Sequence, residues 1–306
     1  MFKKVEYSSS SRSYEYLLQK FKRSIFKRVS KNSPNYFLRG QDLISQGPIA
    51  NGVHDPHLTK LIAHFNEIGY RDFLIDIGAN IGLTSCQNGS AFKRVLCFEP
   101  NPLCLHVLKV NTEIALPNIK CEINEFGLGE SDGEFDLWIP KFNWGGAFVR
   151  SKENSYSDNI LAKKDQFLKI DTNNYLLKKI QIRSCRDTML KKFSSLSEDE
   201  FKKGVIKIDV EGMEEVVLKG IAESIPAEFK VMVIFENWDP DLNFYKIKEY
   251  FSVHQSSLFT FKSYTQNKKN WKRLFGNTQL LLTPLDNSEN NVGDIVVQIG
   301  NLVDSN

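Results

Sequence analysis

Four acidic residues stand at the ends of apolar stretches that have the length and composition of buried strands. They are Asp76, Glu99, Asp209 and Glu236, within or directly after the stretches at 73–77, 94–98, 205–209 and 230–235. Because the carboxyl ends of parallel strands meet at one edge of a sheet, we expect these carboxylates to surround one ligand site. At such an edge a carboxylate can bind hydroxyl or ammonium groups, and it can take a proton from a hydroxyl.

The turn after the first of these strands is rich in glycine. Gly78 and Gly82 lie four residues apart, and a helical stretch follows them. A strand, a glycine-rich turn and a helix open a nucleotide-binding unit, although an isolated pair of glycines suits an ordinary tight turn equally well. The spacing G-x-x-x-G, rather than G-x-G-x-x-G, disfavours a nicotinamide dinucleotide. An aspartate just ahead of the glycines suits the ammonium group of S-adenosylmethionine better than a pyrophosphate.

The next strand supplies a second half of the same site. Glu99 follows Gly78 by 21 residues, an offset at which an acid in doubly wound folds accepts hydrogen bonds from ribose hydroxyls. Asn101 and Pro102 then begin a helix, with Asn101 as its N-cap. The pair of acids therefore favours a nucleotide-like ligand over a plain turn.

At this point the sequence resembles a known family. The segments DIGANIG (76–82), CFEPNP (97–102) and IKIDVEGMEEVVLKG (206–220) resemble signatures of the FkbM family of S-adenosylmethionine-dependent methyltransferases. Weaker similarities lie at 52–55, 185–190 and 231–237. The resemblance implies S-adenosyl-L-methionine as cofactor and oxygen acceptors on sugars, polyketides or lipids. It does not extend to the first forty residues or to 151–179.

The resemblance and the strand ends together assign candidate site residues. The cofactor-binding candidates are Asp76, Gly78, Asn80 and Gly82 for the methionine end and Glu99 for the ribose, with Ala79 and Asn101 beside them. For the adenine they are Glu125 and Phe126 in the stretch 124–127, for which a plain turn is the alternative. The catalytic candidates, which orient or deprotonate the acceptor, are Asp209, Glu211 and Glu236. The alternatives are that Asp209 and Glu211 cap the next helix and that Glu236 is a surface acid.

No metal site is predicted. His54 and His57 flank a helix start at Asp55 and Pro56, but no other ligand completes a metal site there. Capping accounts for Asp55 and Pro56 without a functional role. The five cysteines include no C-x-x-C pair, which indicates free thiols in a reducing compartment.

Strands and helices alternate along most of the chain, which predicts a parallel sheet. With the resemblance, this implies an α/β, Rossmann-like class I methyltransferase fold: a seven-stranded, mostly parallel sheet with helices on both faces. A hairpin is expected at 135–149, and a final antiparallel hairpin through the link at 286–291. We expect a basic N-terminal arm at 1–40 and a methyltransferase domain at 41–306, in which 151–179 is a polar insertion or lid.

The charge is distributed unevenly. The whole chain carries a formal net charge of +3, but residues 1–40 contribute ten Lys and Arg against two Glu, so the remainder is net negative. Because phosphate binding usually needs a basic face, we expect no nucleic acid partner for the domain. A nucleic-acid methyltransferase and a non-catalytic scaffold are kept as alternatives to O-methylation of a glycan or small molecule.

Residues 14–29 have the spacing of a basic amphipathic helix. Three interpretations are open: the helix docks its apolar stripe on the domain, lies on an anionic membrane surface, or holds an acidic partner or glycan. The sequence has no apolar run that suits a membrane span or a signal peptide. We therefore expect a cytoplasmic protein, with a peripheral membrane location as the alternative.

Overall fold

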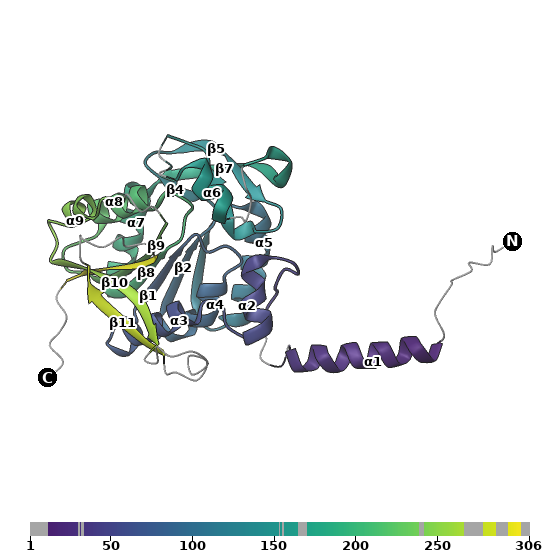
Figure 1. Cartoon of the computed structure of the whole chain (residues 1–306). Helices are drawn as coiled ribbons and strands as arrows, with labels where there is room; N and C mark the ends of the chain where they lie inside the picture. The colour runs from purple at the N-terminus through teal and green to yellow at the C-terminus, as the bar shows by residue number, and fades with distance from the viewer. Residues whose placement is uncertain are drawn as a thin grey trace.

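The computed structural model describes residues 12–29, 31, 34–152, 154, 156–164, 170–238, 242–265, 278–285 and 293–300 of the 306-residue chain. Within these residues the main sheet has eight strands in the order β11-β10-β12-β9-β8-β1-β2-β3 (Figure 1). The parallel strands are β1 (Phe73–Ile77), β2 (Arg94–Phe98), β3 (Lys120–Asn124), β8 (Lys203–Ile208) and β9 (Lys230–Asn237). The antiparallel strands are β10 (Ser256–Thr265), β11 (Thr278–Pro284) and β12 (Gly293–Ile299).

The central strands end in register, and this alignment creates the edge on which the site is built. Ile77 at the end of β1 pairs with Phe98 on one side and with Ile208 on the other. The residues that follow these three strand ends therefore leave the sheet side by side. β1 and β2 are buried along their whole length, as strands covered on both faces must be.

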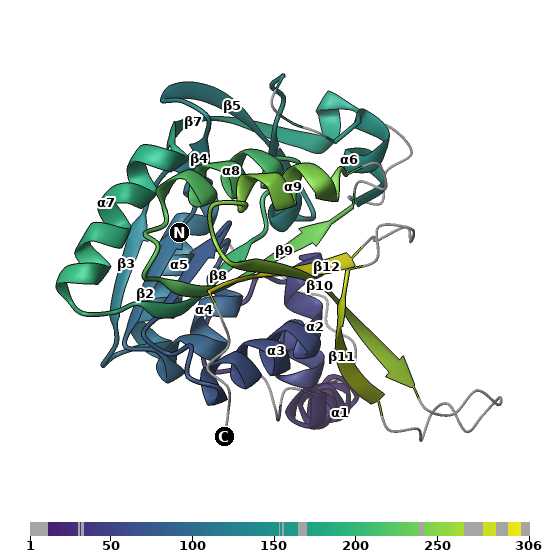
Figure 2. The same ribbon diagram turned by 90° about the vertical axis from the view of Figure 1, so that its left-hand side faces the viewer.

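Helices cover both faces of the main sheet (Figure 2). One face packs against α7 (Cys185–Glu198), α8 (Glu214–Ser224) and α9 (Phe244–Tyr250), and the other against α3 (Pro56–Glu67) and α5 (Pro102–Ala115), with α4 (Leu83–Asn88) and η2 (Gly89–Ala91) between them. Alternate side chains of β1 serve the two cores: Phe73 and Ile75 face the first set of helices, and Leu74 the second. The predicted Rossmann-like class I methyltransferase fold is confirmed.

A smaller sheet stands over the end of the main sheet. Its strands run in the order β4-β7-β5-β6, with β4 (Gly127–Gly129), β5 (Gly133–Pro140), β6 (Phe148–Val149) and β7 (Tyr175–Ser184). The predicted hairpin is confirmed, since Leu137 pairs with Val149 and Trp138 with Phe148 across β5 and β6. Its turn contains the short helix η3 (Trp144–Gly146).

Two predictions about the sheet were wrong in detail. The main sheet has eight strands rather than seven, because β11 pairs with the outer side of β10. Strands β11 and β12 do not form a hairpin with each other; β12 lies between β9 and β10 and pairs with both. Ile295 to Ile299 are buried because their side chains join the cores on the two faces of the sheet. The interior position also pairs both backbone edges of the strand. The predicted link at 286–291 lies outside the described residues.

The polar insertion predicted at 151–179 contains regular structure. It includes α6 (Asp158–Lys164), η4 (Thr172–Asn174) and the first half of β7, while residues 165–169 lie outside the described part. Its first residues fasten to the main domain: Asn154 Nδ2 donates to the carbonyl oxygens of Val149 (2.9 Å) and Glu211 (2.8 Å). The start of this segment is thus a strap across the loop after β8.

The N-terminal helix α1 (Arg12–Val29) projects away from the domain (Figure 1). Leu17 and Phe21 are each 63% exposed and Ile25 is 46% exposed, so the expectation that this stripe docks on the domain was wrong. The chain joins the domain further on, where the main-chain N–H of Phe37 donates to Asn111 Oδ1 (2.7 Å). The short helix α2 (Leu43–Asn51) follows. In the described residues no helix is long and apolar enough to cross a membrane.

Candidate active site

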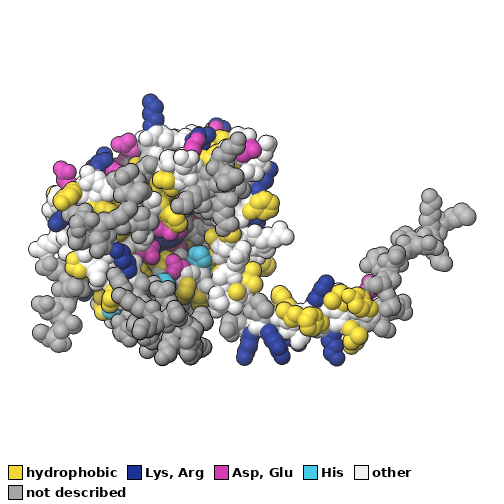
Figure 3. Space-filling view, in the orientation of Figure 1, with side chains coloured by type: hydrophobic (Ala, Val, Ile, Leu, Met, Phe, Trp, Pro, Cys, Tyr) yellow, Lys and Arg dark blue, Asp and Glu magenta, His cyan; other side chains and the backbone are white. Residues whose placement is uncertain are grey.

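A cavity of about 330 Å³ opens at the carboxyl edge of β1, β2, β8 and β9. The glycine turn after β1 and the strand ends form its floor, and residues of β5, β6, β7 and η3 from the small sheet line its other side. In Figure 3, acidic and histidine side chains are visible at the bottom of this hollow. The cavity lies where ligands bind in open α/β sheets.

The glycine turn is held against two neighbouring strands. The main-chain N–H groups of Gly78 and Ala79 both donate to the carbonyl oxygen of Phe98 at 3.0 Å. Gly78 has φ +78°, and a Cβ there would lie 1.9 Å from the carbonyl oxygen of Asp209. Only glycine allows the turn after β1 to pass this close to the end of β8.

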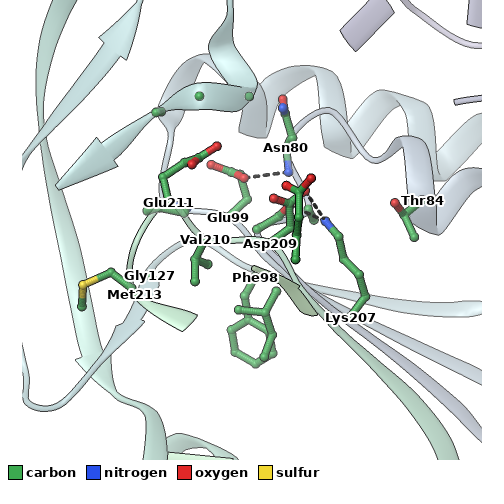
Figure 4. A pocket seen from close by; sticks show the side chains of 18 of the residues that line it. Asn80, Thr84, Phe98, Glu99, Gly127, Lys207, Asp209, Val210, Glu211 and Met213 are labelled. Carbon is green, nitrogen blue, oxygen red and sulfur yellow. Dashed lines mark hydrogen bonds and ion pairs between the residues drawn. The ribbon is translucent and has the colours of Figure 1, made fainter. Parts of the chain in front are cut away.

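Glu99 is buried at the cavity wall and fixed by main-chain donors. Its carboxylate accepts a hydrogen bond from the N–H of Asn80 at 2.7 Å (Figure 4). It accepts a second from the N–H of Asn101, also at 2.7 Å. Burial raises the pKa of Glu99 to about 7, although the two N–H donors and Lys207 oppose the rise. Glu99 therefore changes charge near neutral pH while it faces the cavity.

Lys207 on β8 joins two strand ends through an ion cluster. Its Nζ lies 3.4 Å from Asp76 Oδ1 and 3.0 Å from Asp209 Oδ2, and it donates to the carbonyl oxygen of Gly78 at 3.3 Å. Burial alone would lower the pKa of Lys207, but Asp209 and Asp76 raise it well above its ordinary value. Asp76, which is wholly buried, also accepts from Ser85 Oγ at 2.7 Å. Lys207 is thus a charged part of the framework under the cavity.

Further acidic side chains line the cavity at β9 and β12. In the sheet these strands lie on the other side of β8 and β1 from β2, which Glu99 follows. Asp294 on β12 stands opposite Glu236 on β9 in the antiparallel register, and both line the cavity. Burial, followed by the charges of Asp55, Glu236 and Asp209, raises the pKa of Asp294 to about 7. This side of the cavity is rich in hydrogen-bond acceptors.

Seven of the twelve predicted site residues line the cavity. They are Gly78, Ala79, Asn80, Glu99, Asp209, Glu211 and Glu236. They come from four strand ends far apart in the sequence, which the sheet brings together.

The other five predicted residues lie outside the cavity lining. Asp76 lies beneath it in the ion cluster, and Gly82 begins α4 with φ +87°. Asn101 caps α5 by accepting from the N–H of Leu103. Glu125 pairs with Lys109 at 2.6 Å on the surface, and Phe126 packs its ring against Phe98. In place of these last two, the cavity is lined by Gly127.

Several lining residues are not among the twelve predicted site residues. They are His54, Asp55, Trp144, Lys207 and Asp294. His54 and Asp55 were assigned to a helix start without a functional role. Asp55 does cap α3, by accepting from the N–H groups of His57 and Leu58. The weak similarity at 52–55 was the signal that pointed to His54.

The family described as methyltransferase FkbM domain matches residues 76–256. The chain belongs to this family. FkbM membership makes the protein an S-adenosylmethionine-dependent methyltransferase, as the resemblance implied. A protein of Sordaria araneosa named methyltransferase sdnD is 28% identical over 176 residues, which cover 55% of this chain and 67% of that protein.

Solved structures with a similar arrangement were also found. A precorrin-6Y C5,15-methyltransferase from Geobacter metallireducens is 10% identical, with a TM-score of 0.39, covering 87% of this chain and 94% of that one. An O-methyltransferase from Bacillus cereus in complex with SAH is 12% identical, with a TM-score of 0.37, covering 95% and 92%.

The residues around the cavity fit the FkbM cofactor. Glu99 presents a buried carboxylate, already fixed by two N–H donors, to a cavity of the size that small-molecule sites have. The close approach at Gly78 keeps the turn free of side-chain bulk. The chain's cofactor is S-adenosylmethionine.

The ion pairs of Lys207 predict that its removal destabilises the fold. Lys207→Met leaves the buried Asp76 carboxylate without its counter-charge, and we expect the free energy of unfolding to fall by about 3–5 kcal/mol. Urea denaturation measures this loss. Adding Asp76→Asn to the variant removes the uncompensated charge and is expected to restore at least half of it.

The matched control is Lys203→Met on the same strand, which is expected to change stability little. Equal losses for the two lysines, or no recovery in the double variant, contradict the role given to Lys207.

Proposed function

We propose that the FkbM protein transfers a methyl group from S-adenosylmethionine to a hydroxyl of a sugar, glycan, lipid or other small molecule. The observation that carries this proposal is the acceptor-rich lining: Asp209, Glu236 and Asp294 face the cavity, and its lysine is engaged by Asp76 and Asp209. Carboxylates accept hydrogen bonds from hydroxyl groups. They repel phosphorylated acceptors and nucleic acids.

We assign the cofactor to the side of the cavity formed by the turn after β1. Gly78, Ala79 and Asn80 provide a close main-chain surface for the methionine end, and the Glu99 carboxylate is placed to accept from ribose hydroxyls. Bound there, S-adenosylmethionine supplies an electrophilic methyl group on a sulfonium. Asp76 acts on this side indirectly, by holding Lys207.

We assign the acceptor to the side formed by the ends of β8, β9 and β12. Asp209, Glu211 and Glu236 line this side and orient the acceptor through hydrogen bonds to its hydroxyls. Holding the reacting oxygen in line with the methyl group is the main contribution the protein makes to such a displacement. Residues of η3 and β6 in the small sheet shield the site from water.

A screen with isotope-labelled S-adenosylmethionine tests the acceptor class. We expect label in hydroxylated acceptors, presented as neutral glycans, glycolipids and polyhydroxylated small molecules, and none in RNA or DNA. Mass spectrometry then identifies the methylated atom. Label on nucleic acid, or only on amine nitrogens, contradicts the proposal.

The position of Glu99 predicts a pH dependence of cofactor binding. Since its pKa is about 7, the carboxyl is protonated below pH 7 and must lose that proton to accept two ribose hydroxyls. We expect the affinity for S-adenosylmethionine to fall about tenfold from pH 8 to pH 6. Calorimetric titration measures it.

Two variants separate this effect from general acid sensitivity. Glu99→Gln is expected to weaken binding and to remove the pH dependence, while Glu125→Gln, which changes a surface acid, keeps both. Affinity that stays constant between pH 6 and pH 8 in the unaltered protein argues against Glu99 as the ribose ligand.

We also propose that α1 lies on an anionic membrane surface. Its apolar residues Tyr14, Leu17, Phe21 and Ile25 are exposed, and Figure 3 shows most apolar side chains along one side of the helix and most basic ones along the other. Residues 14–29 carry five Lys and Arg and one Glu. Pairing with a second α1 would bring like charges together, whereas anionic headgroups complement them.

Vesicle binding tests this location with the full chain. We expect sedimentation with vesicles that contain phosphatidylserine but not with phosphatidylcholine alone. Phe21→Gln, on the apolar side, is expected to reduce binding. Tyr16→Gln removes an equally exposed aromatic ring from the other side of the helix and leaves binding unchanged. Binding that ignores Phe21→Gln, or a lipid-free dimer that Phe21→Gln abolishes, contradicts the proposal.

A further inference from the structure

The strap at the start of the 151–179 segment contacts both parts of the main domain that carry acceptor-side carboxylates. Glu211 lies in the loop between β8 and α8, and Glu236 lies near the end of β9. The two strands are neighbours in the sheet, and both residues line the cavity. A contact that joins the loop after β8 to the end of β9 therefore fixes how these two carboxylates stand relative to each other.

Asn154 binds the loop after β8 at Glu211 itself. Its Nδ2 donates to the carbonyl oxygens of Val149 and Glu211, and its Oδ1 accepts from the main-chain N–H of Tyr156 at 2.9 Å. A Cβ at Gly212 would lie 1.9 Å from Asn154 Oδ1, so the loop and this side chain lie as close together as glycine permits. Asn154 thus fixes both the main chain at Glu211 and the place of Tyr156.

The Tyr156 hydroxyl extends this connection to β9. It donates to Glu214 Oε1 at the start of α8, at 3.2 Å, and it accepts from the main-chain N–H of Trp238, directly after β9, at 3.4 Å. A tyrosine hydroxyl has one proton to donate. The proton serves α8 and the oxygen serves the end of β9, so one hydroxyl links the two.

The ring of Tyr156 is held as firmly as its hydroxyl. Tyr156 is buried in an apolar cluster with Phe148, Leu161 and Tyr175. Burial raises the pKa of Tyr156, and the charge of Glu214 raises it further. The hydroxyl therefore keeps its proton at neutral pH, as the bond to Glu214 requires.

We infer that Asn154 and Tyr156 are positioning residues that set Glu211 and Glu236 relative to each other. This inference rests on the proposed function, which assigns the acceptor to the side of the cavity that these carboxylates line. Neither Asn154 nor Tyr156 is among the described residues that line the cavity, so both act through the segments they hold. A misplacement of about 1 Å can lower the rate of an aligned reaction about 10²-fold.

Amide hydrogen exchange in the full chain tests the connection without cofactor or acceptor. Tyr156→Phe keeps the ring and removes the oxygen. We expect the Trp238 amide to exchange about fivefold faster, together with amides of the loop at 209–214. The amides of Gly78 and Ala79, which bind the Phe98 carbonyl oxygen, are expected to exchange as before. Unchanged exchange at Trp238 overturns the inference.

Kinetics with the acceptor found in the labelled screen tests the role in turnover. Tyr156→Phe is expected to lower kcat by about 10–100-fold, with little change in the KM of the acceptor and none in the calorimetric affinity for S-adenosylmethionine. Asn154→Asp keeps the acceptor for the Tyr156 N–H but cannot donate to the Glu211 carbonyl oxygen, and we expect the same pattern.

The matched control is Leu161→Val, which removes a methylene group from the same apolar cluster and leaves both hydrogen bonds of the Tyr156 hydroxyl in place. We expect it to lower thermal stability while kcat stays unchanged. If Leu161→Val lowers kcat as much as Tyr156→Phe does, the segment has a purely structural role and the inference is overturned.

The outcomes distinguish this inference from the proposed function. If the unaltered protein and Leu161→Val methylate no hydroxyl, the proposed function fails, and the exchange measurement still decides whether Tyr156 links the two segments. If they methylate a hydroxyl and Tyr156→Phe keeps its full kcat, only the positioning role fails.

Discussion

An ion cluster built on the buried side chains of Lys207 and Asp76 joins the two central strand ends on which the active site depends. Lys207 on β8 lies between Asp76 on β1 and Asp209 just after β8, and it also binds the carbonyl oxygen of Gly78. Removing the lysine alone, or the aspartates alone, leaves an uncompensated charge in the protein interior, which solvates ions poorly. The cluster therefore ties the glycine turn, to which we assign the cofactor, to Asp209, to which we assign the acceptor.

This connection divides the cavity into two chemically different sides. On one side Glu99 is held by main-chain N–H groups, so its carboxylate is positioned before any ligand arrives. On the other side carboxylates and the His54 imidazole line the part of the cavity to which we assign the acceptor. The small sheet lines the opposite wall of the cavity, and Asn154 fastens the segment after β6 to the carbonyl oxygen of Glu211. A methyl donor and a hydroxyl acceptor need this kind of separation, with one shared point at which they meet.

Much of the fold could be predicted from the sequence, because short apolar runs that alternate with helices leave few other arrangements. The aligned strand ends followed from the parallel sheet, and they correctly gathered Glu99, Asp209 and Glu236. The order of β9, β12, β10 and β11 could not be predicted. β12 pairs with β9 and β10, and no short turn in the sequence indicates either pairing.

The site was predictable where main-chain geometry fixes the residue type, as at Gly78. It was not predictable where the same residue type suits both a ligand contact and a structural role, such as an ion pair or a helix cap. The sequence predicts Asp76 as a cofactor ligand, but in the structure Asp76 pairs with Lys207. This lysine lies on a strand more than a hundred residues further along the chain, so the pairing could not be predicted. His54 stands beside a helix cap in the sequence, and only its place in the cavity lining indicates a second role.

A crystal structure with S-adenosylhomocysteine tests most directly the claim that the ion cluster is framework and Glu99 is ligand. The account predicts ribose hydroxyls on the Glu99 carboxylate, with Lys207 still paired to Asp76 and Asp209 and without contact to the ligand. A ribose held elsewhere, or a Lys207 that leaves Asp76 to bind the ligand, would contradict it.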